Sequence, residues 1–348
     1  MRVAIIGLGL IGGSWGLALR EWSRSEEGKN SKLEIVGFDA KATQRNEAQK
    51  QGVCDRTTLT PMEAVVGAEV VIVATPPLVM RETFEDIAAH LSRGAIVTDT
   101  ASTKREVLRW AKELLPDTIS FIGGHPMAGK TASLEGATAT LFNKCTYCLI
   151  PLPNAQAGAI EALTRLVEIV GGRPHFIDPA EHDSYVAAIS HLPFLMSVAL
   201  TNLTSESEGW REISKLAAGG YQDMTRLSGG SVTMHLDICR TNSDAILDWL
   251  DRYQQTLTDL RAVIEKAGLY DEEGRPRPSA ETDPVLLQDY IERAHKARER
   301  WEEERARPPQ IEGLEQINLP TKKELQAEYT RMFTGSWLKR RTPDNGKK

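Results

Sequence analysis

The feature that most constrains this chain is a glycine pattern close to its first residue. The segment 7–12 reads G-x-G-x-x-G and lies between an apolar stretch that predicts a β-strand and an amphipathic stretch that predicts a helix. In this context glycines allow a tight turn and let the backbone approach the pyrophosphate of a dinucleotide. The free N–H groups that open the helix also favour an anion. We therefore predict a cofactor site at Gly7, Gly9, Leu10, Ile11 and Gly12.

Two later strand ends extend this prediction. Asp39 ends the next predicted strand, where its carboxylate would bond to ribose hydroxyls and repel a 2′-phosphate, so NAD is the expected cofactor. Lys41 and Arg45 follow closely and keep NADP open, and a turn residue is the alternative reading of Asp39. Thr75 and Pro76 end a further strand at the carboxyl edge of the sheet, where we expect them to flank the ribose or the nicotinamide.

The pattern of apolar segments predicts two kinds of domain. Continuous apolar strands alternate with helical patterns up to about residue 177, which is typical of a doubly wound, mostly parallel α/β Rossmann sheet. Asp178, Pro179 and Glu181 then form a helix-start signature, and strand signals disappear. We predict an NAD-binding Rossmann domain over 1–178, an all-α substrate and dimerisation domain over 179–306, and an extended or partly disordered tail over 307–348.

Composition excludes several classes of function. A net charge of −6 and a pI near 5.8 disfavour a nucleic-acid-binding surface. We find no apolar run long enough for a bilayer and no secretory signal, so no membrane contact and a cytoplasmic location are expected. Cys145 and Cys148 form C-x-x-C in a predicted strand, where a three-residue offset sends the side chains to opposite faces; we expect no metal site.

Three residues are candidates for chemistry. Ser102 lies in TDTASTK, His125 in GGHPMAG and His191 in ISHLP, and the chain has only seven histidines. We expect His125 in a loop that follows a strand, where a histidine on its own is more often structural than catalytic. Pro193 should kink the helix that carries His191 because it leaves the Ile189 carbonyl unpaired; a buried histidine satisfied by the backbone is the alternative there.

Taken together and in order, these motifs resemble the prephenate/arogenate dehydrogenase family. The order is GLGLIGGS, TPP, DTASTK, GGHPMAG, HD with ISHLP, and GYQDMTR, over roughly residues 1–265. The resemblance implies a Rossmann domain followed by an all-helical domain that forms a homodimer. It implies oxidative decarboxylation of prephenate to 4-hydroxyphenylpyruvate with hydride transfer to NAD, in tyrosine biosynthesis. Arogenate as substrate, giving tyrosine directly, is the alternative.

The resemblance also implies roles for single residues. His125 would take the proton of the ring hydroxyl while the carbon that bears it gives hydride to the nicotinamide. Ser102 would hold that hydroxyl or the nicotinamide, and His191 would be aimed at the substrate. Arg226 would pair with a substrate carboxylate, with a surface salt bridge as its alternative role, and Gln222 would lie beside the substrate.

The chain departs from the family pattern on the substrate side. Phe194 stands where many relatives that use prephenate have a second histidine, Gln222 replaces an arginine, and His235 occupies the place of a tryptophan. These changes bear on the choice of substrate more than on the type of reaction. One alternative assignment is to the β-hydroxyacid dehydrogenases or pyrroline-carboxylate reductases, in which a different loop is expected after the fourth strand. The other alternative is a non-catalytic NAD-binding sensor or scaffold.

Overall fold

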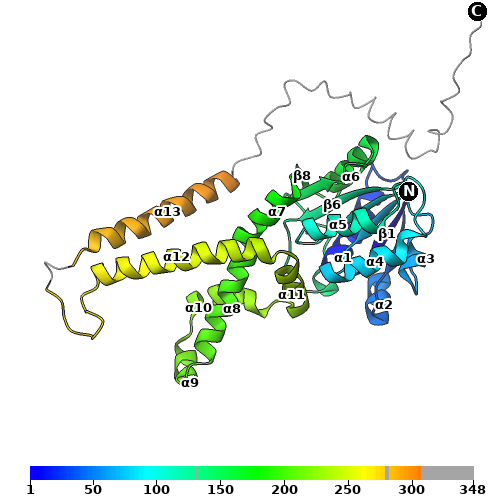
Figure 1. Cartoon of the computed structure of the whole chain (residues 1–348). Helices are drawn as coiled ribbons and strands as arrows, with labels where there is room; N and C mark the ends of the chain where they lie inside the picture. The colour runs from blue at the N-terminus through cyan, green and yellow to red at the C-terminus, as the bar shows by residue number, and fades with distance from the viewer. Residues whose placement is uncertain (131, 279–281, 307–348) are drawn as a thin grey trace, which may run out of the picture. The chain divides into compact units, whose positions relative to one another are not determined.

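The computed structural model describes residues 1–130, 132–278 and 282–306. The first part of the chain forms an eight-stranded sheet in the order β3-β2-β1-β4-β5-β6-β7-β8 (Figure 1). Neighbouring strands are parallel except β6 and β7, which are antiparallel. The strands are β1 (Arg2–Ile6), β2 (Glu34–Phe38), β3 (Arg56–Thr57), β4 (Val70–Val73), β5 (Ile96–Asp99), β6 (Ser120–Pro126), β7 (Thr146–Pro151) and β8 (Arg173–Phe176).

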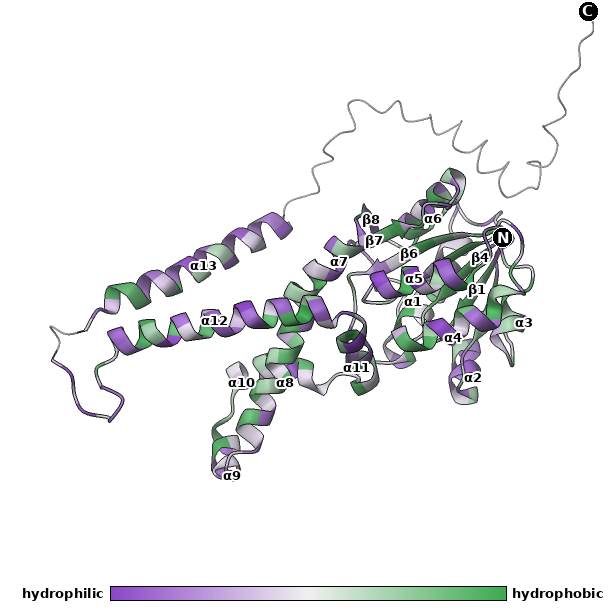
Figure 2. Ribbon diagram, viewed as in Figure 1, coloured by the Kyte–Doolittle hydropathy of each residue, from purple (hydrophilic) through white to green (hydrophobic). Residues whose placement is uncertain are grey.

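Both faces of this sheet are covered by helices, which is why its central strands are continuously apolar (Figure 2). In β1, Ala4 and Ile6 belong to one buried cluster, whereas Val3 and Ile5 belong to the cluster on the opposite face. The first cluster is closed by α3 (Pro61–Val65), α4 (Pro77–Ala88) and α5 (Arg105–Leu114), the second by α1 (Leu10–Arg24), α2 (Ala42–Lys50) and α6 (Ala157–Ile169). The expected Rossmann sheet is confirmed.

The C-x-x-C pair obeys the same alternation. Cys148 belongs to one buried cluster and Cys145 packs against the other, so the two thiols lie on opposite faces of the sheet. All four cysteines are free thiols. Burial raises the pKa of Cys145 to about 11, which keeps that side chain a protonated thiol at neutral pH.

Helices take over after β8, as expected. The side chain of Asp178 accepts hydrogen bonds from the N–H groups of Ala180 and Glu181, and Pro179 follows it as the first helical residue. The elements that follow are α7 (Pro179–Val186), η2 (Ala187–His191), α8 (Leu192–Ser205), α9 (Trp210–Ile213), η3 (Ser214–Leu216), α10 (Gly219–Thr225), η4 (Arg226–Gly229), α11 (Val232–Thr241) and α12 (Ser243–Ala267). A short 3₁₀ turn, η1 (Leu134–Gly136), precedes β7.

Helices α7 and α8 join without a break through η2, a π-helical turn. By length and composition the resulting helix, Pro179–Ser205, contains an 18-residue stretch apolar enough to cross a bilayer, with a mean hydropathy of 1.5 over that stretch. The sequence-based statement that no such run exists was therefore wrong. Ser190, His191 and Pro193 interrupt the apolar residues along the sequence, but the helix continues through all three. Polar residues of the same helix are buried against the Rossmann domain, as described below.

The first helices of this region pack on the carboxyl edge of the sheet. Helix α7 contacts α5, and α11 contacts α4. The carboxylate of Asp237 in α11 accepts a hydrogen bond from the N–H of Leu78 in the first turn of α4, at 3.1 Å. The hydroxyls of Thr103 and Thr241 lie 2.9 Å apart in buried surroundings. Segments that follow β4 and β5 are thereby enclosed by helical residues.

The chain divides into two compact units, Met1–Arg252 and Tyr253–Lys348. In the second unit, the rest of α12 is followed by a loop in which Asp271 bonds to the N–H groups of Glu273 and Arg275. Helix α13 (Pro284–Ala306) follows. The predicted tail, 307–348, lies outside the described residues.

Candidate active site

The turn between β1 and α1 has the geometry that a dinucleotide needs. Gly7 adopts a φ of +96°, and an added Cβ there would lie 2.6 Å from the Ala74 oxygen. A Cβ at Gly12 would lie 2.0 Å from the Gly7 oxygen, whereas one at Gly9 would meet nothing within 4 Å. These three positions therefore differ: Gly7 and Gly12 are required by the fold itself, and Gly9 leaves open space in front of the helix.

The start of α1 is free to bind an anion. Its N-cap, Gly9, has no side chain to accept from the first N–H groups, and the first turn holds no acidic residue. A pyrophosphate placed there would meet helical N–H groups. The predicted residues Leu10 and Ile11 are in this first turn.

Asp39 lies directly after β2, beside the glycine turn. Its carboxylate accepts hydrogen bonds from the N–H groups of Leu8, at 3.0 Å, and Lys41, at 2.9 Å. Arg45 donates to the backbone oxygen of Asp39 at 2.6 Å and not to its carboxylate. The carboxylate is thus held at the end of the strand next to the turn, where ribose hydroxyls are expected.

Thr75 and Pro76 follow β4 and lead into α4, for which Pro76 is the N-cap. The hydroxyl oxygen of Thr75 is buried and has no hydrogen-bond partner among the described residues. A buried hydroxyl without a partner is costly, so a ligand that bonds to it fits this position. Together with the open helix start and Asp39, it makes the carboxyl edge of the sheet suitable for a dinucleotide.

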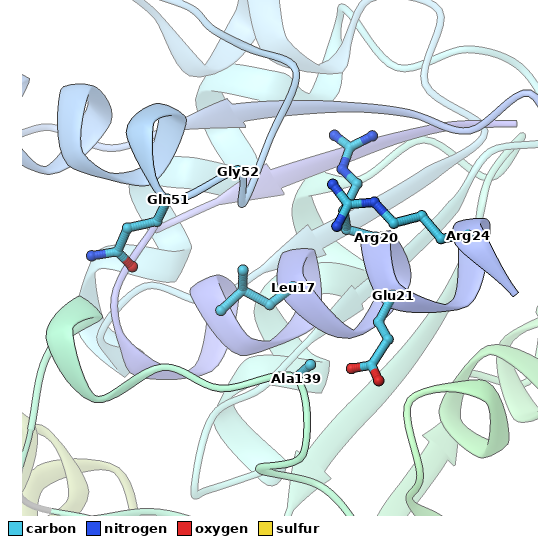
Figure 3. Close-up of a pocket in the computed structure, with 7 residues that line it drawn as sticks. All are labelled: Leu17, Arg20, Glu21, Arg24, Gln51, Gly52 and Ala139. Carbon is cyan, nitrogen blue, oxygen red and sulfur yellow. The ribbon is translucent and has the colours of Figure 1, made fainter.

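A surface pocket of about 320 Å³ elsewhere on α1 is a different feature (Figure 3). It lies on the last part of the helix, roughly 15 Å of helix length from the N–H groups of the first turn. Its lining is Leu17, Arg20, Glu21, Arg24, Gln51, Gly52 and Ala139.

The candidate base, His125, lies in strand β6 and is buried. The prediction of a loop after a strand was wrong, because His125 pairs with Cys148 of β7 in the antiparallel ladder. Its Nδ1 lies 2.9 Å from Nε2 of His182 in α7. Nδ1 of His182 in turn lies 2.8 Å from the carboxylate of Asp183. The three side chains form one buried hydrogen-bonded row.

Asp183 is the anchor of this row. Its carboxylate also accepts from the backbone N–H groups of Lys104, at 2.7 Å, and Arg105, at 3.0 Å, at the start of α5. Burial alone would raise the pKa of Asp183, but these hydrogen bonds and the one from His182 lower it below its usual value. Asp183 therefore stays an anion at neutral pH.

A buried ion pair lies on the other side of His125. Lys104 and Asp99 are both fully buried, their side chains are hydrogen-bonded to each other, and Lys104 donates to the Gly124 oxygen at 2.6 Å. The pKa of His125 is lowered well below its usual value, first by burial and then by the charges of His182, Lys104 and His191. His125 is therefore neutral at neutral pH and can accept a proton.

His191 approaches the same site from η2. It is 2 % exposed, its Nδ1 lies 3.3 Å from Nδ2 of Asn242, and its Nε2 has no partner among the described residues. Burial lowers its pKa to about 4. The helix forms a π turn that ends at His191, two residues before Pro193, where the sequence predicted a kink.

Ser102 lies between β5 and α5, two residues before Lys104, and is half-buried. The two predicted substrate residues are further out: Gln222 in α10 and Arg226 in η4 are exposed. In the described part of the chain Arg226 forms no salt bridge. Neither side chain bonds to His125 or His191 in the described chain.

Two of the positions that depart from the family pattern touch each other. The rings of Phe194 and His235 stack with centroids 3.6 Å apart and an interplanar angle of 17°. His235 also contributes to the low pKa of His191. The sequence analysis named both residues as departures, but it gave no sign that they meet.

Sequence reasoning overlooked several site residues. Asp99, Lys104 and the HD pair were part of quoted motifs and received no role, and Asn242 was not considered. The available signal was an aspartate that ends an apolar strand and a lysine five residues later, since such residues are rarely buried without a partner.

Comparisons with known proteins agree with this geometry. The family model described as "Prephenate dehydrogenase, nucleotide-binding domain" matches residues 17–175, and "Prephenate dehydrogenase, dimerization domain" matches residues 178–273. A prephenate dehydrogenase of Bacillus subtilis is 34 % identical over 269 residues, which cover 76 % of this chain and 70 % of that protein.

Solved structures give the same result. Prephenate dehydrogenase from A. aeolicus in complex with hydroxyphenyl propionate and NAD+ is 25 % identical, with a TM-score of 0.73 over 86 % of this chain and 98 % of that one. Synechocystis arogenate dehydrogenase is 28 % identical, with a TM-score of 0.67 over 86 % of this chain and 100 % of that one. The sequence, the sheet and the helical region together show that this chain belongs to the prephenate dehydrogenase family.

Proposed function

We propose that this protein is an NAD-dependent prephenate dehydrogenase that converts prephenate to 4-hydroxyphenylpyruvate in tyrosine biosynthesis. The observation that carries the proposal is the buried row His125–His182–Asp183 at the carboxyl edge of a dinucleotide-binding sheet. A neutral, oriented imidazole beside a hydride acceptor is what oxidation of an alcohol requires. The relatives named above support the choice of substrate.

The cofactor would be held by the glycine turn at residues 7–12, by Asp39 and by the segment at Thr75 and Pro76. When bound, NAD supplies the hydride acceptor. The anionic Asp39 favours NAD over NADP because a 2′-phosphate would meet a like charge.

The protein residues would act on the substrate ring. His125 takes the proton of the ring hydroxyl while the C–H bond on the same carbon breaks with loss of hydride. The C–C bond to the ring carboxylate then breaks, carbon dioxide leaves, and its electron pair makes the ring aromatic. The proton on His125 returns to the oxygen that becomes the phenol, so no net proton is released.

Other residues would position the substrate. We assign Ser102 to the hydroxyl or the nicotinamide, and Arg226 and Gln222 to the substrate side. A guanidinium without an ion-pair partner in the described chain suits a substrate carboxylate. Arogenate differs from prephenate in having an amino group in place of the keto group, and Phe194, Gln222 and His235 are the positions at which the choice between the two would be made.

The assembly would be a homodimer through the helical domain. Leu203, Leu216 and Val232 are 75 %, 85 % and 82 % exposed, which leaves apolar area that a second copy of the domain would cover. The dimerization-domain match at 178–273 covers all three. We propose the domain limits 1–178 and 179–306, a small-molecule substrate, no nucleic-acid or membrane partner, and a cytoplasmic location.

The test is NADH formation by the purified full chain, with prephenate and arogenate compared and with NAD and NADP compared. The His125→Asn variant is expected to lose about 10²- to 10⁴-fold in turnover while still binding NAD. The exposed His175→Asn is the matched control and should remain active. Turnover of neither substrate with either cofactor, alongside normal NAD binding, would favour the non-catalytic sensor.

A further inference from the structure

We propose that His125 and His191 are held in opposite tautomers, so that His125 presents a proton acceptor and His191 a hydrogen-bond donor to one bound substrate. The inference rests on the proposed function for the identity of that substrate. The tautomers themselves follow from the hydrogen-bond network of the protein alone. His191 is then a donor that orients the substrate and is not a second base.

The network starts at Asn242, whose amide orientation is fixed. Nη2 of Arg105 lies 3.0 Å from Oδ1 of Asn242, and a guanidinium can only donate. On the other side, Nδ2 of Asn242 lies 2.8 Å from the backbone oxygen of Asp183, which can only accept. Both contacts require the same orientation, and the residue is fully buried. The NH₂ group of Asn242 therefore faces His191.

This orientation decides the tautomer of His191. Nδ2 of Asn242 lies 3.3 Å from Nδ1 of His191, and because Nδ2 donates, Nδ1 must accept. A neutral imidazole that accepts at Nδ1 carries its hydrogen on Nε2. That Nε2 is the buried atom with no partner among the described residues. Such a donor is costly to bury, and an oxygen of a bound ligand would satisfy it.

The row through Asp183 decides the tautomer of His125. The Asp183 carboxylate is an anion and accepts from Nδ1 of His182, which leaves Nε2 of His182 as an acceptor. Nδ1 of His125 must then donate to that Nε2 across 2.9 Å. The lone pair of His125 is therefore on its own Nε2. Asp183 controls both histidines, one through its carboxylate and the other through its backbone oxygen.

Groups from every neighbouring element surround the two rings. His125 faces Lys104 and Asp99 at the sheet edge and His182 with Asp183 from α7, and His191 faces Asp183, His182 and His235. An extra proton on Nε2 of His182 would make that nitrogen the donor and Nδ1 of His125 the acceptor. The hydrogen of His125 would then lie on Nε2, which distinguishes this state from the proposed one.

The opposite tautomers suit an alcohol. A hydroxyl hydrogen can be donated to Nε2 of His125 while an oxygen of the same molecule accepts from Nε2–H of His191. Two histidines in the same tautomer would present either two acceptors, which one hydroxyl hydrogen cannot satisfy together, or two donors, which would leave that hydrogen without a base.

The direct test is a long-range ¹H–¹⁵N correlation spectrum of the full-length dimer labelled with ¹⁵N-histidine, recorded at neutral pH without substrate. His125→Asn and His191→Gln assign the signals. Hydrogen on Nδ1 of His125 and on Nε2 of His191 is the expected result. Equal tautomers, swapped tautomers or a doubly protonated His182 would overturn the inference. None of these results depends on turnover, so failure of the proposed function is recognised separately.

A second test removes the hydrogen-bond donor that faces Nδ1 of His191. Asn242→Asp replaces the NH₂ group by an acceptor, so His191 should take its hydrogen on Nδ1 or become doubly protonated, and kcat/KM should fall about 10- to 100-fold. Asn154→Asp introduces the same charge at an exposed position and is the matched control. A His191 spectrum unchanged in Asn242→Asp would show that Asn242 does not set the tautomer.

The role of His191 as a donor is tested by substitution in pairs. His191→Gln keeps an N–H donor, whereas His191→Glu presents only acceptors when ionised. The glutamine variant should retain at least about tenfold more kcat/KM than the glutamate variant, with both keeping the His125 tautomer. Equal losses in the two variants would contradict a donor role.

Discussion

Nδ1 of His125 lies 2.9 Å from Nε2 of His182, although 57 residues separate the two along the chain. One ring belongs to the antiparallel β6–β7 ladder and the other to the helix that starts at Pro179. The contact therefore exists only when the first helix of the second region packs on the carboxyl edge of the sheet. It joins the proposed base to a carboxylate that is itself anchored at the start of α5.

The glycine turn predicts a contrast between two substitutions. Gly12→Ala should destabilise the fold and weaken NAD binding, because its Cβ would lie 2.0 Å from the Gly7 oxygen. Gly9→Ala should leave the melting temperature nearly unchanged and weaken NAD binding alone, since nothing within 4 Å in the protein opposes its Cβ. Thermal unfolding and NAD titration measure both effects. A Gly9→Ala protein that binds NAD normally would show that the pyrophosphate lies elsewhere.

The buried ion pair predicts a large loss of stability. Lys104→Met leaves Asp99 buried without its cation and should lower the free energy of unfolding by about 3–5 kcal/mol. The double variant Lys104→Met with Asp99→Leu should recover part of that loss. Urea unfolding gives the values, and Arg109→Ala, which removes only exposed ion pairs, should change the midpoint little. Equal midpoints for Lys104→Met and the wild type would refute the burial of this pair.

The low pKa of His191 predicts how stability depends on pH. The pKa is about 4 in the folded protein and about 6.5 in the unfolded chain. Between these values the unfolded state binds the extra proton, so stability is complete above about pH 6.5 and falls as the pH drops towards 4. His191 alone should contribute a loss of about 2 kcal/mol between pH 7 and pH 5.

Urea unfolding at several pH values measures this slope. His125, whose pKa is also lowered by burial, acts in the same direction. The loss between pH 7 and pH 5 should be smaller in His191→Gln than in the wild type, because glutamine does not titrate. An identical loss in the two proteins would mean that His191 titrates normally in the fold.

Asp39 predicts the choice between cofactors. Asp39→Ser removes the like charge opposite a 2′-phosphate, so the ratio of kcat/KM for NAD to that for NADP should fall at least about tenfold. Asp55→Ser is a control at the other end of β2, where the carboxylate accepts from the N–H of Ile35 and pairs with Arg20. Steady-state rates with each cofactor supply the ratio. An unchanged ratio would indicate that Asp39 is only a turn residue and does not select the cofactor.

The sequence by itself determined the parts of this protein that depend on local pattern. Gly7 and Gly12 are required by close backbone approaches, continuous apolar strands require burial on both faces, and Asp178 with Pro179 begins a helix. The order and spacing of the motifs also predicted membership of the prephenate/arogenate dehydrogenase family, which the comparisons confirmed.

Tertiary structure alone decided which residues of the site are buried and which hydrogen bonds join them. Whether His125 lies in a loop or a strand depends on its pairing with Cys148, and the helix continues through Pro193 after a π turn. The burial of Lys104 with Asp99 and the contact of Asn242 with His191 are likewise set by packing. Periodicity reports which face of an element is apolar, but a hydrogen bond between distant elements depends on distances of a few tenths of an ångström that only the packed chain fixes.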